Sequence, residues 1–222
     1  MIDFQSARES MVNSQLRARG IVDPRVLNAM LRVPRHEFVP EPYRDDSYQD
    51  YPLPIGEGQT ISQPYVVAVM LELLQLAGSE KVLEVGTGSG YVTALLSQLA
   101  AEVFSIERYA DLAATAAATL TTFGYSNIQV LTGDGSLGLP ANAPFDAILV
   151  SAAAPAVPPP LIVQLVEGGR LVIPVGSPDR QDLLRIVKRR GRLERKTLCA
   201  CRFVPLLGVH GWSPALQEAA RE

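Results

Sequence analysis

Residues 82–91 read VLEVGTGSGY, an apolar run that passes through an acidic residue into a glycine-rich turn. The run from Lys81 to Val85 has the length of a short buried strand, and Tyr91 to Leu99 has the pattern of a helix. The glycines between them let the backbone turn sharply and approach a ligand. Ligands of open α/β sheets bind beyond the carboxyl ends of the strands, so this stretch predicts the fold and the first part of a binding site.

The alternation of short apolar runs with helical runs continues toward the C-terminus. We predict strands at 102–107, 128–132, 145–151 and 170–175, and helices at about 109–123 and 159–167, the second ended by Gly168-Gly169. This alternation predicts a Rossmann-like, doubly wound α/β fold with a mostly parallel sheet and helices on both faces. Residues 183–187 and 193–204 alternate around Gly191 without a helix, which predicts a C-terminal antiparallel hairpin.

Upstream of the glycine turn, apolar residues recur at helical spacing over 5–33, and Gly20 and Asp23-Pro24 divide this stretch into two helices. An irregular stretch rich in proline and tyrosine runs to about residue 58, and a helix is expected over 64–76. We therefore expect one domain over residues 1–222. It comprises an N-terminal helical cap and substrate loop (1–63), a cofactor-binding core (64–212) and a tail (213–222) that reads as a frayed helix.

Composition indicates an ordinary globular protein and argues against several classes of partner. The 222 residues carry a formal net charge of −3, which offers no general attraction to nucleic acid or to an anionic membrane. The basic run at 188–192 is interpreted as a solvated hairpin tip. No apolar segment is long enough to cross a bilayer, and no signal peptide is visible. We expect a cytoplasmic monomer.

The cysteines and histidines do not form a metal-ligand set. Cys199 and Cys201 are two residues apart on an expected strand, where a disulfide would be strained. The chain has only two histidines, His36 and His210, too few with these cysteines to predict a zinc site. We expect two reduced thiols, two histidines with structural hydrogen bonds, and no metal.

The glycine spacing separates two kinds of cofactor. Residues Gly86, Gly88 and Gly90 follow the pattern Gly-x-Gly-x-Gly, whereas a dinucleotide fingerprint would place its third glycine where this chain has Tyr91. The carboxylate of Glu84 would repel a pyrophosphate beside the turn, but it would favour an ammonium or sulfonium group. The turn therefore disfavours a nicotinamide dehydrogenase.

Acidic residues follow the next two strands. Glu107 ends the second strand, where its carboxylate can accept hydrogen bonds from both ribose hydroxyls of a nucleoside, and Asp134 follows the third, where it can meet the adenine edge. Acidic sites at successive strand ends suit a nucleoside that lies across the sheet. We predict an S-adenosylmethionine site built from the acidic residues and the turns beside them: Glu84, Gly86, Thr87, Gly88, Gly90, Glu107, Asp134 and Gly135.

The segment GEGQTISQP at 56–64 carries a more specific signal. It closely resembles the segment that precedes the cofactor strand in the protein-L-isoaspartate O-methyltransferase family. The resemblance runs from about residue 5 to Trp212, and it also covers RHEFVP at 35–40, SAAAP at 151–155, GGRLVIPVG at 168–176 and RFVPL at 202–206. Ser136 departs from it, because many relatives have a bulky aromatic residue there.

The resemblance implies a class I methyltransferase fold and transfer of a methyl group to the α-carboxylate of L-isoaspartyl residues in damaged proteins. The ester then cyclises to a succinimide, and hydrolysis restores some normal aspartate. It also implies that Ser62 is the active-site serine and that Thr60, Ile61 and Gln63 line the same loop. A carboxylate is already ionised at neutral pH, so Ser62 is expected to orient it by a hydrogen bond and no general base is needed.

Other interpretations stay open at this point. Ser62 precedes an expected helix and is also a candidate N-cap. A methyltransferase with another acceptor would keep the cofactor site and change the meaning of residues 59–64. A nucleic-acid-binding protein using the basic hairpin tip is a third, weaker reading.

Overall fold

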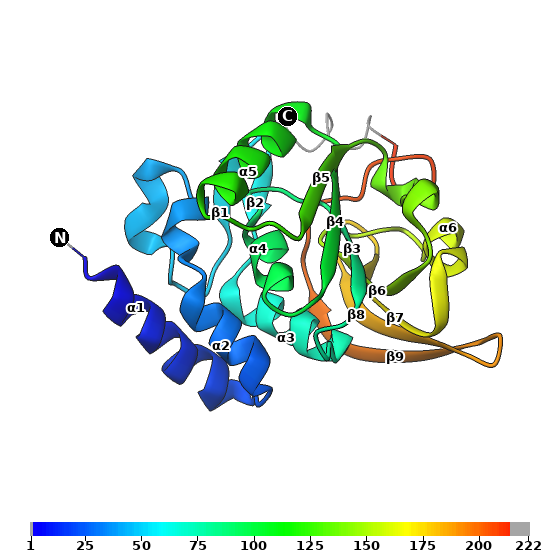
Figure 1. Ribbon diagram of the computed structural model, residues 1–222, viewed down its shortest axis with the longest axis horizontal. Coiled ribbons are helices and arrows are strands. Elements are labelled where there is room, and N and C mark those ends of the chain that lie inside the picture. Colours follow the sequence, from blue (N-terminus) through cyan, green and yellow to red (C-terminus); the bar gives the residue numbers. More distant parts are fainter. Residues whose placement is uncertain (1, 214–222) are drawn as a thin grey trace.

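The computed structural model describes residues 2–213 and is built around one seven-stranded sheet (Figure 1). The strand order is β5-β4-β3-β6-β7-β8-β9. The first five strands in this order are parallel, and β8 and β9 are antiparallel to their neighbours. The bounds are β3 Lys81–Val85, β4 Glu102–Glu107, β5 Ile128–Thr132, β6 Phe145–Val150, β7 Leu165–Gly176, β8 Gln181–Arg189 and β9 Arg192–Cys201. The predicted fold class and the C-terminal hairpin are confirmed.

Helices cover both faces of the sheet, as Figure 1 shows. Helices α3 (Pro64–Leu74), α4 (Tyr91–Ser97) and α5 (Ala110–Thr122) lie on one face, and α6 (Pro159–Val163) lies on the other. Successive residues of a strand point to opposite faces, so Val82 belongs to the core on the α3 and α4 side and Leu83 to the core on the α6 side. The apolar run of β3 is explained by this burial on both faces.

The N-terminal cap contains the two predicted helices. Helix α1 (Phe4–Ser10) continues as the π-helical turn η1 (Met11–Leu16) and the 3₁₀ turn η2 (Arg17–Arg19), and α2 spans Pro24–Arg32. Between them, Gly20 has a φ of +93°. The Asp23 carboxylate accepts the Arg25 N–H at 2.8 Å and so caps α2, with Pro24 as its first helical residue. Two further 3₁₀ turns, η3 (Arg35–Phe38) and η4 (Glu41–Asp46), lead toward the sheet.

The expected helix at 159–167 is wrong in its second half. Helix α6 ends at Val163, and β7 already begins at Leu165, so that Gly168-Gly169 lies within β7 and does not end a helix. Leu165 is fully buried and pairs with Phe145, whereas Arg170 pairs with Ala147. The extra residues between these pairs form an irregularity in which Gly168 has a φ of +80°. Burial of Leu165 against β6 outweighs the local helical pattern.

A small hairpin lies in the stretch that was expected to be irregular. Strand β1 (Leu53–Gly56) pairs antiparallel with β2 (Gln59–Ile61). Its turn residues Glu57 and Gly58 have φ values of +51° and +67°, and two such residues suit the right-handed twist of a two-residue hairpin. The hairpin presents the GQTIS segment at a defined edge, close to the glycine turn.

The remaining short elements are the 3₁₀ turns η5 (Gly135–Leu137) and η6 (Pro140–Asn142). In residues 2–213, no helix is both long and apolar enough to span a membrane. Within the same range, no group of three or more potential ligands is placed to hold a metal ion. The frayed helix expected over 213–222 lies outside the described residues apart from Ser213.

Candidate active site

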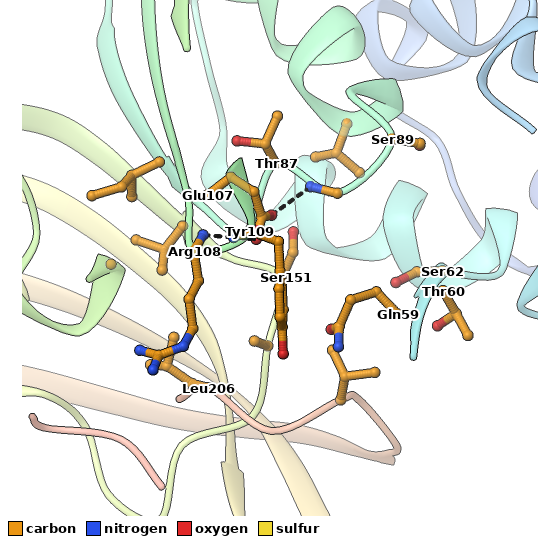
Figure 2. Close-up of a pocket in the computed structure, with 18 of the residues that line it drawn as sticks. Gln59, Thr60, Ser62, Thr87, Ser89, Glu107, Arg108, Tyr109, Ser151 and Leu206 are labelled. Atoms are coloured by element: carbon orange, nitrogen blue, oxygen red, sulfur yellow. Dashed lines mark hydrogen bonds between the residues drawn. The ribbon is translucent and has the colours of Figure 1, made fainter. Parts of the chain in front are cut away.

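A cavity lies at the carboxyl ends of β3, β4 and β6, where the sequence predicts a ligand (Figure 2). Three segments far apart in the sequence meet there: the hairpin segment before α3, the glycine turn after β3, and the C-terminal segment around Leu206. The lining residues are Gln59–Ser62, Val85–Ser89, Tyr91, Val92, Ile106–Tyr109, Gly135, Ser151, Ala152 and Val204–Leu207.

The glycine turn is held in a backbone conformation that other residues rarely adopt. Gly86, Gly88 and Gly90 have φ values of +94°, +53° and +87°. Gly90 precedes α4, and a β-carbon there would lie 3.2 Å from the Cβ of Ala116. The turn therefore needs glycine both for its conformation and, at Gly90, for close packing with α5. Gly86 and Gly88 have no side chains, so their backbone lines the cavity.

Glu107 is the central acidic residue of the cavity. Its Oε2 accepts the Gly88 N–H at 2.8 Å, and its Oε1 accepts the N–H groups of Arg108 and Tyr109 at 2.7 and 3.0 Å. The Gly88 N–H, which could donate to a phosphate at this turn, therefore already donates to the Glu107 carboxylate. Carboxylate oxygens have further lone pairs that can accept from hydroxyl groups. A nucleoside ribose fits this arrangement, and a pyrophosphate does not.

The structure corrects the expected position of Glu84. Its side chain does not line the cavity; it lies fully buried beneath the turn, where its Oε2 accepts from the hydroxyls of Thr93 and Ser105 at 2.5 and 2.7 Å. Burial raises the pKa of Glu84 to about 8, although both hydroxyl hydrogen bonds oppose the rise. Glu84 is therefore largely neutral at pH 7. The expected attraction between a charged Glu84 and a ligand ammonium or sulfonium group is therefore wrong, because the carboxyl is buried and carries little charge.

Asp134 also differs from the prediction. It does not line the cavity, whereas the neighbouring Gly135 does. Its Oδ1 accepts from the N–H and hydroxyl of Ser136 at 2.9 and 2.7 Å, and its Oδ2 accepts the Val209 N–H at 2.8 Å. Burial acts to raise the pKa of Asp134, but these hydrogen bonds outweigh it and lower the pKa overall. Asp134 joins the loop after β5 to the C-terminal segment.

Ser136 has a structural reason to be small and polar. Its hydroxyl donates to Asp134 and accepts the His210 N–H at 3.0 Å. Gly208 passes so close that a β-carbon on it would lie 2.6 Å from the Ser136 Oγ. The C-terminal segment fills the space in which a bulky aromatic residue at position 136 would lie.

The substrate loop is positioned by a buried arginine. The guanidinium of Arg35 has no exposed surface; its Nη2 donates to the Ser62 carbonyl at 2.8 Å, and its Nε donates to the Ser47 carbonyl at 2.6 Å. Gln63, not Ser62, is the N-cap residue of α3, and it makes no side-chain capping bond. The capping interpretation of Ser62 is therefore wrong, and its side chain lines the cavity together with Thr60 and Ile61.

A second cavity adjoins the first, between β9, α3 and the N-terminal cap. It is lined by Arg19, Pro52, Gly58, Thr60, Ser62, Gln63, Tyr65, Val66, Val69, Ser151, Pro178, Gln181, Cys199–Pro205 and Trp212. Five residues line both cavities: Thr60, Ser62, Ser151, Val204 and Pro205. We call these five residues the junction.

Eight of the predicted site residues come together in the first cavity, and four do not. Those that line it are Thr60, Ile61, Ser62, Gly86, Thr87, Gly88, Glu107 and Gly135. Gln63 lines only the second cavity, and Glu84, Gly90 and Asp134 line neither. The prediction omitted Arg108, Tyr109 and Ser151. All three lie within two residues of a strand end, and that position is the signal that could have identified them.

The two histidines lie outside both cavities. His36 stacks on Phe4 with ring centroids 4.1 Å apart, and its Nδ1 is 2.8 Å from the Tyr48 hydroxyl. Burial lowers the pKa of His36, so the ring is neutral at pH 7. His210 contributes its backbone N–H to Ser136. The structural interpretation of His36 is confirmed. Cys199 and Cys201 are free thiols on β9.

Comparisons with known proteins place this geometry in one family. Residues 6–211 match the family model described as Protein-L-isoaspartate(D-aspartate) O-methyltransferase (PCMT). A relative from Koribacter versatilis, named protein-L-isoaspartate O-methyltransferase, is 60% identical over 96% of each chain. One of the same name from Syntrophus aciditrophicus is 54% identical over 95% of this chain and 98% of its own.

Solved structures agree with the sequence relatives. A protein-L-isoaspartate O-methyltransferase is 30% identical and superposes with a TM-score of 0.83 over 96% of this chain and 69% of its own. A Plasmodium falciparum structure, described as a complex of a PCMT with S-adenosyl-L-homocysteine, is 28% identical and has a TM-score of 0.80 over 93% of this chain and 99% of its own.

Proposed function

The chain belongs to the protein-L-isoaspartate(D-aspartate) O-methyltransferase family, and we propose that the methyl group passes to the isoaspartyl carboxylate at the junction of its two cavities. The protein is an S-adenosylmethionine-dependent methyltransferase that esterifies the α-carboxylate of L-isoaspartyl residues in damaged proteins and peptides. Ester formation starts repair, because the neighbouring peptide nitrogen attacks the ester carbonyl and expels methanol. The succinimide that results is opened by water, partly to aspartate.

The observation that carries the proposal is that the two cavities share Ser62 and the rest of the junction. A methyl donor and an acceptor must meet at bonding distance, so the two ligands need adjoining sites with a common wall. The first cavity holds the features of a nucleoside site, and the second is open and is lined by polar and apolar residues of α3, β9 and the segment after β9. The first is assigned to S-adenosylmethionine and the second to the peptide.

The residues assigned to the cofactor are those that face the first cavity. The backbone of Gly86, Thr87 and Gly88 would approach its amino-acid part, and Glu107 would accept from the ribose hydroxyls. Gly135, which packs against Val85 and Ile106, would form the wall beside the adenine. S-adenosylmethionine supplies an electrophilic methyl group on a sulfonium sulfur. Glu84 and Asp134 act indirectly, Glu84 by supporting the turn and Asp134 by securing the loop that contains Gly135.

The residues assigned to the acceptor orient a group that is already reactive. A carboxylate with an ordinary pKa near ~4 is ionised at pH 7 and needs no base to attack a methyl group. Ser62 would donate its hydroxyl hydrogen to one carboxylate oxygen, while Thr60, Ile61 and Gln63 shape the wall beside it. The charged residues that line the second cavity are Arg202 and Arg19, of which Arg19 is paired with Asp50, and this positive lining suits an anionic acceptor.

Several finer properties belong to the same proposal. The whole chain acts as one catalytic unit, with the cap at 1–63 supplying the peptide side and the core at 64–212 the cofactor side. The enzyme is a cytoplasmic monomer that binds neither nucleic acid nor membranes, in keeping with its net charge of −3. Size-exclusion chromatography with light scattering tests the monomer directly: a mass of twice 24.0 kDa would contradict it.

A pair of peptides tests the central reaction. The two share one sequence and differ only in whether the central residue is L-isoaspartyl or L-aspartyl, and methyl ester formation is measured with labelled S-adenosylmethionine. The isoaspartyl peptide should be methylated and the aspartyl peptide should not. Equal rates on both peptides, or none on either while a small carboxylic acid is methylated, would assign the site to another acceptor.

A further inference from the structure

We propose that Ser151 is a second hydroxyl donor to the substrate carboxylate, placed across the junction from Ser62. The proposal rests on the function proposed above and adds a positioning group that the predicted site did not contain. It assigns Ser62 and Ser151 to the two oxygens of one carboxylate, approached from two walls of the junction.

The backbone of Ser151 is fixed at the centre of the sheet. It directly follows β6, its N–H donates to the Val85 carbonyl at 2.8 Å, and β6 lies beside β3 in the strand order. Gly86 lies against it: a β-carbon on Gly86 would be 3.5 Å from the Ser151 Cβ. The hydroxyl is therefore carried by a strand end, one of the most rigid positions available for a functional group.

The hydroxyl of Ser151 faces the space between the two ligands. Ser151 lines both cavities and is half-buried. In the view of Figure 2, Ser151 lies between Glu107 on one side and Ser62, Thr60 and Gln59 on the other. Its position, on the sheet rather than on the substrate loop, differs from that of Ser62. A carboxylate entering the junction from the second cavity would meet both hydroxyls.

Neither hydroxyl is used within the protein. Among residues 2–213, no hydrogen bond of the Ser62 or Ser151 side chain is present, whereas the nearby Thr87 and Ser105 hydroxyls lie 2.6 Å apart and bond to each other. Both serines are half-buried and line the wall shared by the two cavities. Because neither hydroxyl is engaged by the described protein residues, both are available to donate to a ligand that accepts hydrogen bonds there.

The chemistry suits an ionised acceptor. A carboxylate has two oxygens that accept hydrogen bonds, and a serine hydroxyl rotates to donate. One donor fixes one oxygen but leaves the group free to turn about that bond. A second donor would hold the plane of the carboxylate and direct the attacking oxygen toward the first cavity, which raises the rate by orientation.

Single variants distinguish this role from the alternatives. Ser151→Ala should lower kcat/KM for the isoaspartyl peptide about tenfold or more, as expected for one lost hydrogen bond to a charged group. Its affinity for S-adenosylhomocysteine, measured by calorimetry, should stay within about twofold of wild type. Ser151→Thr, which keeps the hydroxyl, should recover most of the loss. Ser126→Ala, an exposed serine between α5 and β5, is the matched control.

Three results would overturn the proposal. An unchanged kcat/KM in Ser151→Ala would show that the hydroxyl does not orient the carboxylate. A loss of affinity for S-adenosylhomocysteine equal to the loss in kcat/KM would assign the hydroxyl to the cofactor. If Ser151→Thr does not recover activity and its melting temperature is unchanged, the size of the side chain matters and its hydroxyl does not. If Ser62→Ala is impaired while Ser151→Ala is normal, the proposed function stands and this inference alone fails.

A double-mutant cycle tests whether the two hydroxyls act on one group. If Ser62 and Ser151 bind the same carboxylate, the loss in Ser62→Ala/Ser151→Ala should differ from the product of the single losses by several-fold, because neighbouring groups on one ligand couple. Multiplicative losses would mean two separate ligand groups and would contradict the shared assignment. Wild-type isoaspartyl activity in the same assay shows that the proposed function itself holds.

Discussion

The Oε2 of Glu107 accepts the Gly88 N–H at 2.8 Å, so the end of β4 is bonded to the turn that follows β3. One carboxylate therefore holds two neighbouring loops of the sheet in register. It also occupies the Gly88 N–H that a phosphate at this turn would otherwise accept from. This contact explains why the Gly-x-Gly-x-Gly turn of this chain serves a nucleoside rather than a pyrophosphate.

Replacement of Glu107 should weaken cofactor binding more than any other single change in the first cavity. Glu107→Ala removes acceptors for two ribose hydroxyls and frees the Gly88 N–H, and each hydrogen bond to a charged group contributes about 1.5–3 kcal/mol. The dissociation constant of S-adenosylhomocysteine should rise at least about 100-fold by calorimetry. Asp111→Asn, an exposed acidic residue at the start of α5, serves as the control. Unchanged affinity in Glu107→Ala would reduce Glu107 to a structural residue.

Ser62→Ala should separate turnover from cofactor binding. Loss of one donor to a charged carboxylate costs about 1.5–3 kcal/mol, so kcat/KM for an isoaspartyl peptide should fall about 10- to 100-fold. The affinity for S-adenosylhomocysteine should change little, because the hydroxyl faces the junction. Steady-state kinetics and calorimetry on the same preparation give both values. A collapse of cofactor binding would return Ser62 to a structural role.

Glu84 predicts a specific dependence of stability on pH. The pKa of Glu84 is about 8 in the fold because of its burial, against 4.5 in the unfolded chain. The folded state thus keeps a proton that the unfolded state loses, so this residue makes stability fall as pH rises from about 4.5 to about 8, with no further change above. The effect is on the order of a few kcal/mol.

Glu84→Gln isolates that effect, because the amide keeps the size and does not titrate. Melting temperatures of wild type and Glu84→Gln should be measured between pH 5 and pH 9. The wild-type value should decline relative to the variant across this range, and the two curves should run in parallel only above about pH 8. Parallel curves over the whole range would mean that Glu84 ionises in the fold as it does in water.

Arg35→Lys tests how the cap positions the substrate loop. Arg35 donates to the carbonyls of Ser47 and Ser62 from two arms of one guanidinium, a geometry that a single ammonium does not reproduce. A buried carbonyl left unpaired costs about 1–3 kcal/mol. We expect a lower melting temperature and a higher KM for the peptide, with nearly normal cofactor affinity.

The matched control for Arg35 is Arg32→Lys, on the exposed end of α2. It should melt and turn over as wild type. Burial lowers the pKa of Arg35 to about 10, so the guanidinium stays charged at neutral pH and the expected effects concern geometry rather than charge. An equal loss of peptide and cofactor affinity in Arg35→Lys would indicate a general loosening of the fold.

Much of this protein follows from local sequence. The strand–turn–helix at 82–91, the alternation after it, the Asp23-Pro24 start of α2 and the hairpin turn at Gly191 depend on residues close in the chain, whose backbone preferences and periodicity act locally. Glu107 was predictable for the same reason, since it ends a strand beside the glycine turn. The SAAAP segment beginning at Ser151 was visible as a pattern, but nothing local marked its hydroxyl.

Other features were decided by contacts between distant residues. Leu165 extends as a strand because Phe145 lies beside it, against its helical surroundings. Glu84 turns away from the ligand because its carboxyl bonds to Thr93 of α4 and Ser105 of β4, beneath the glycine turn. The junction exists because the loop of Ser62, the strand end at Ser151 and the C-terminal segment meet there. Strand ends determine where a site lies, and only packing determines which side chains face it.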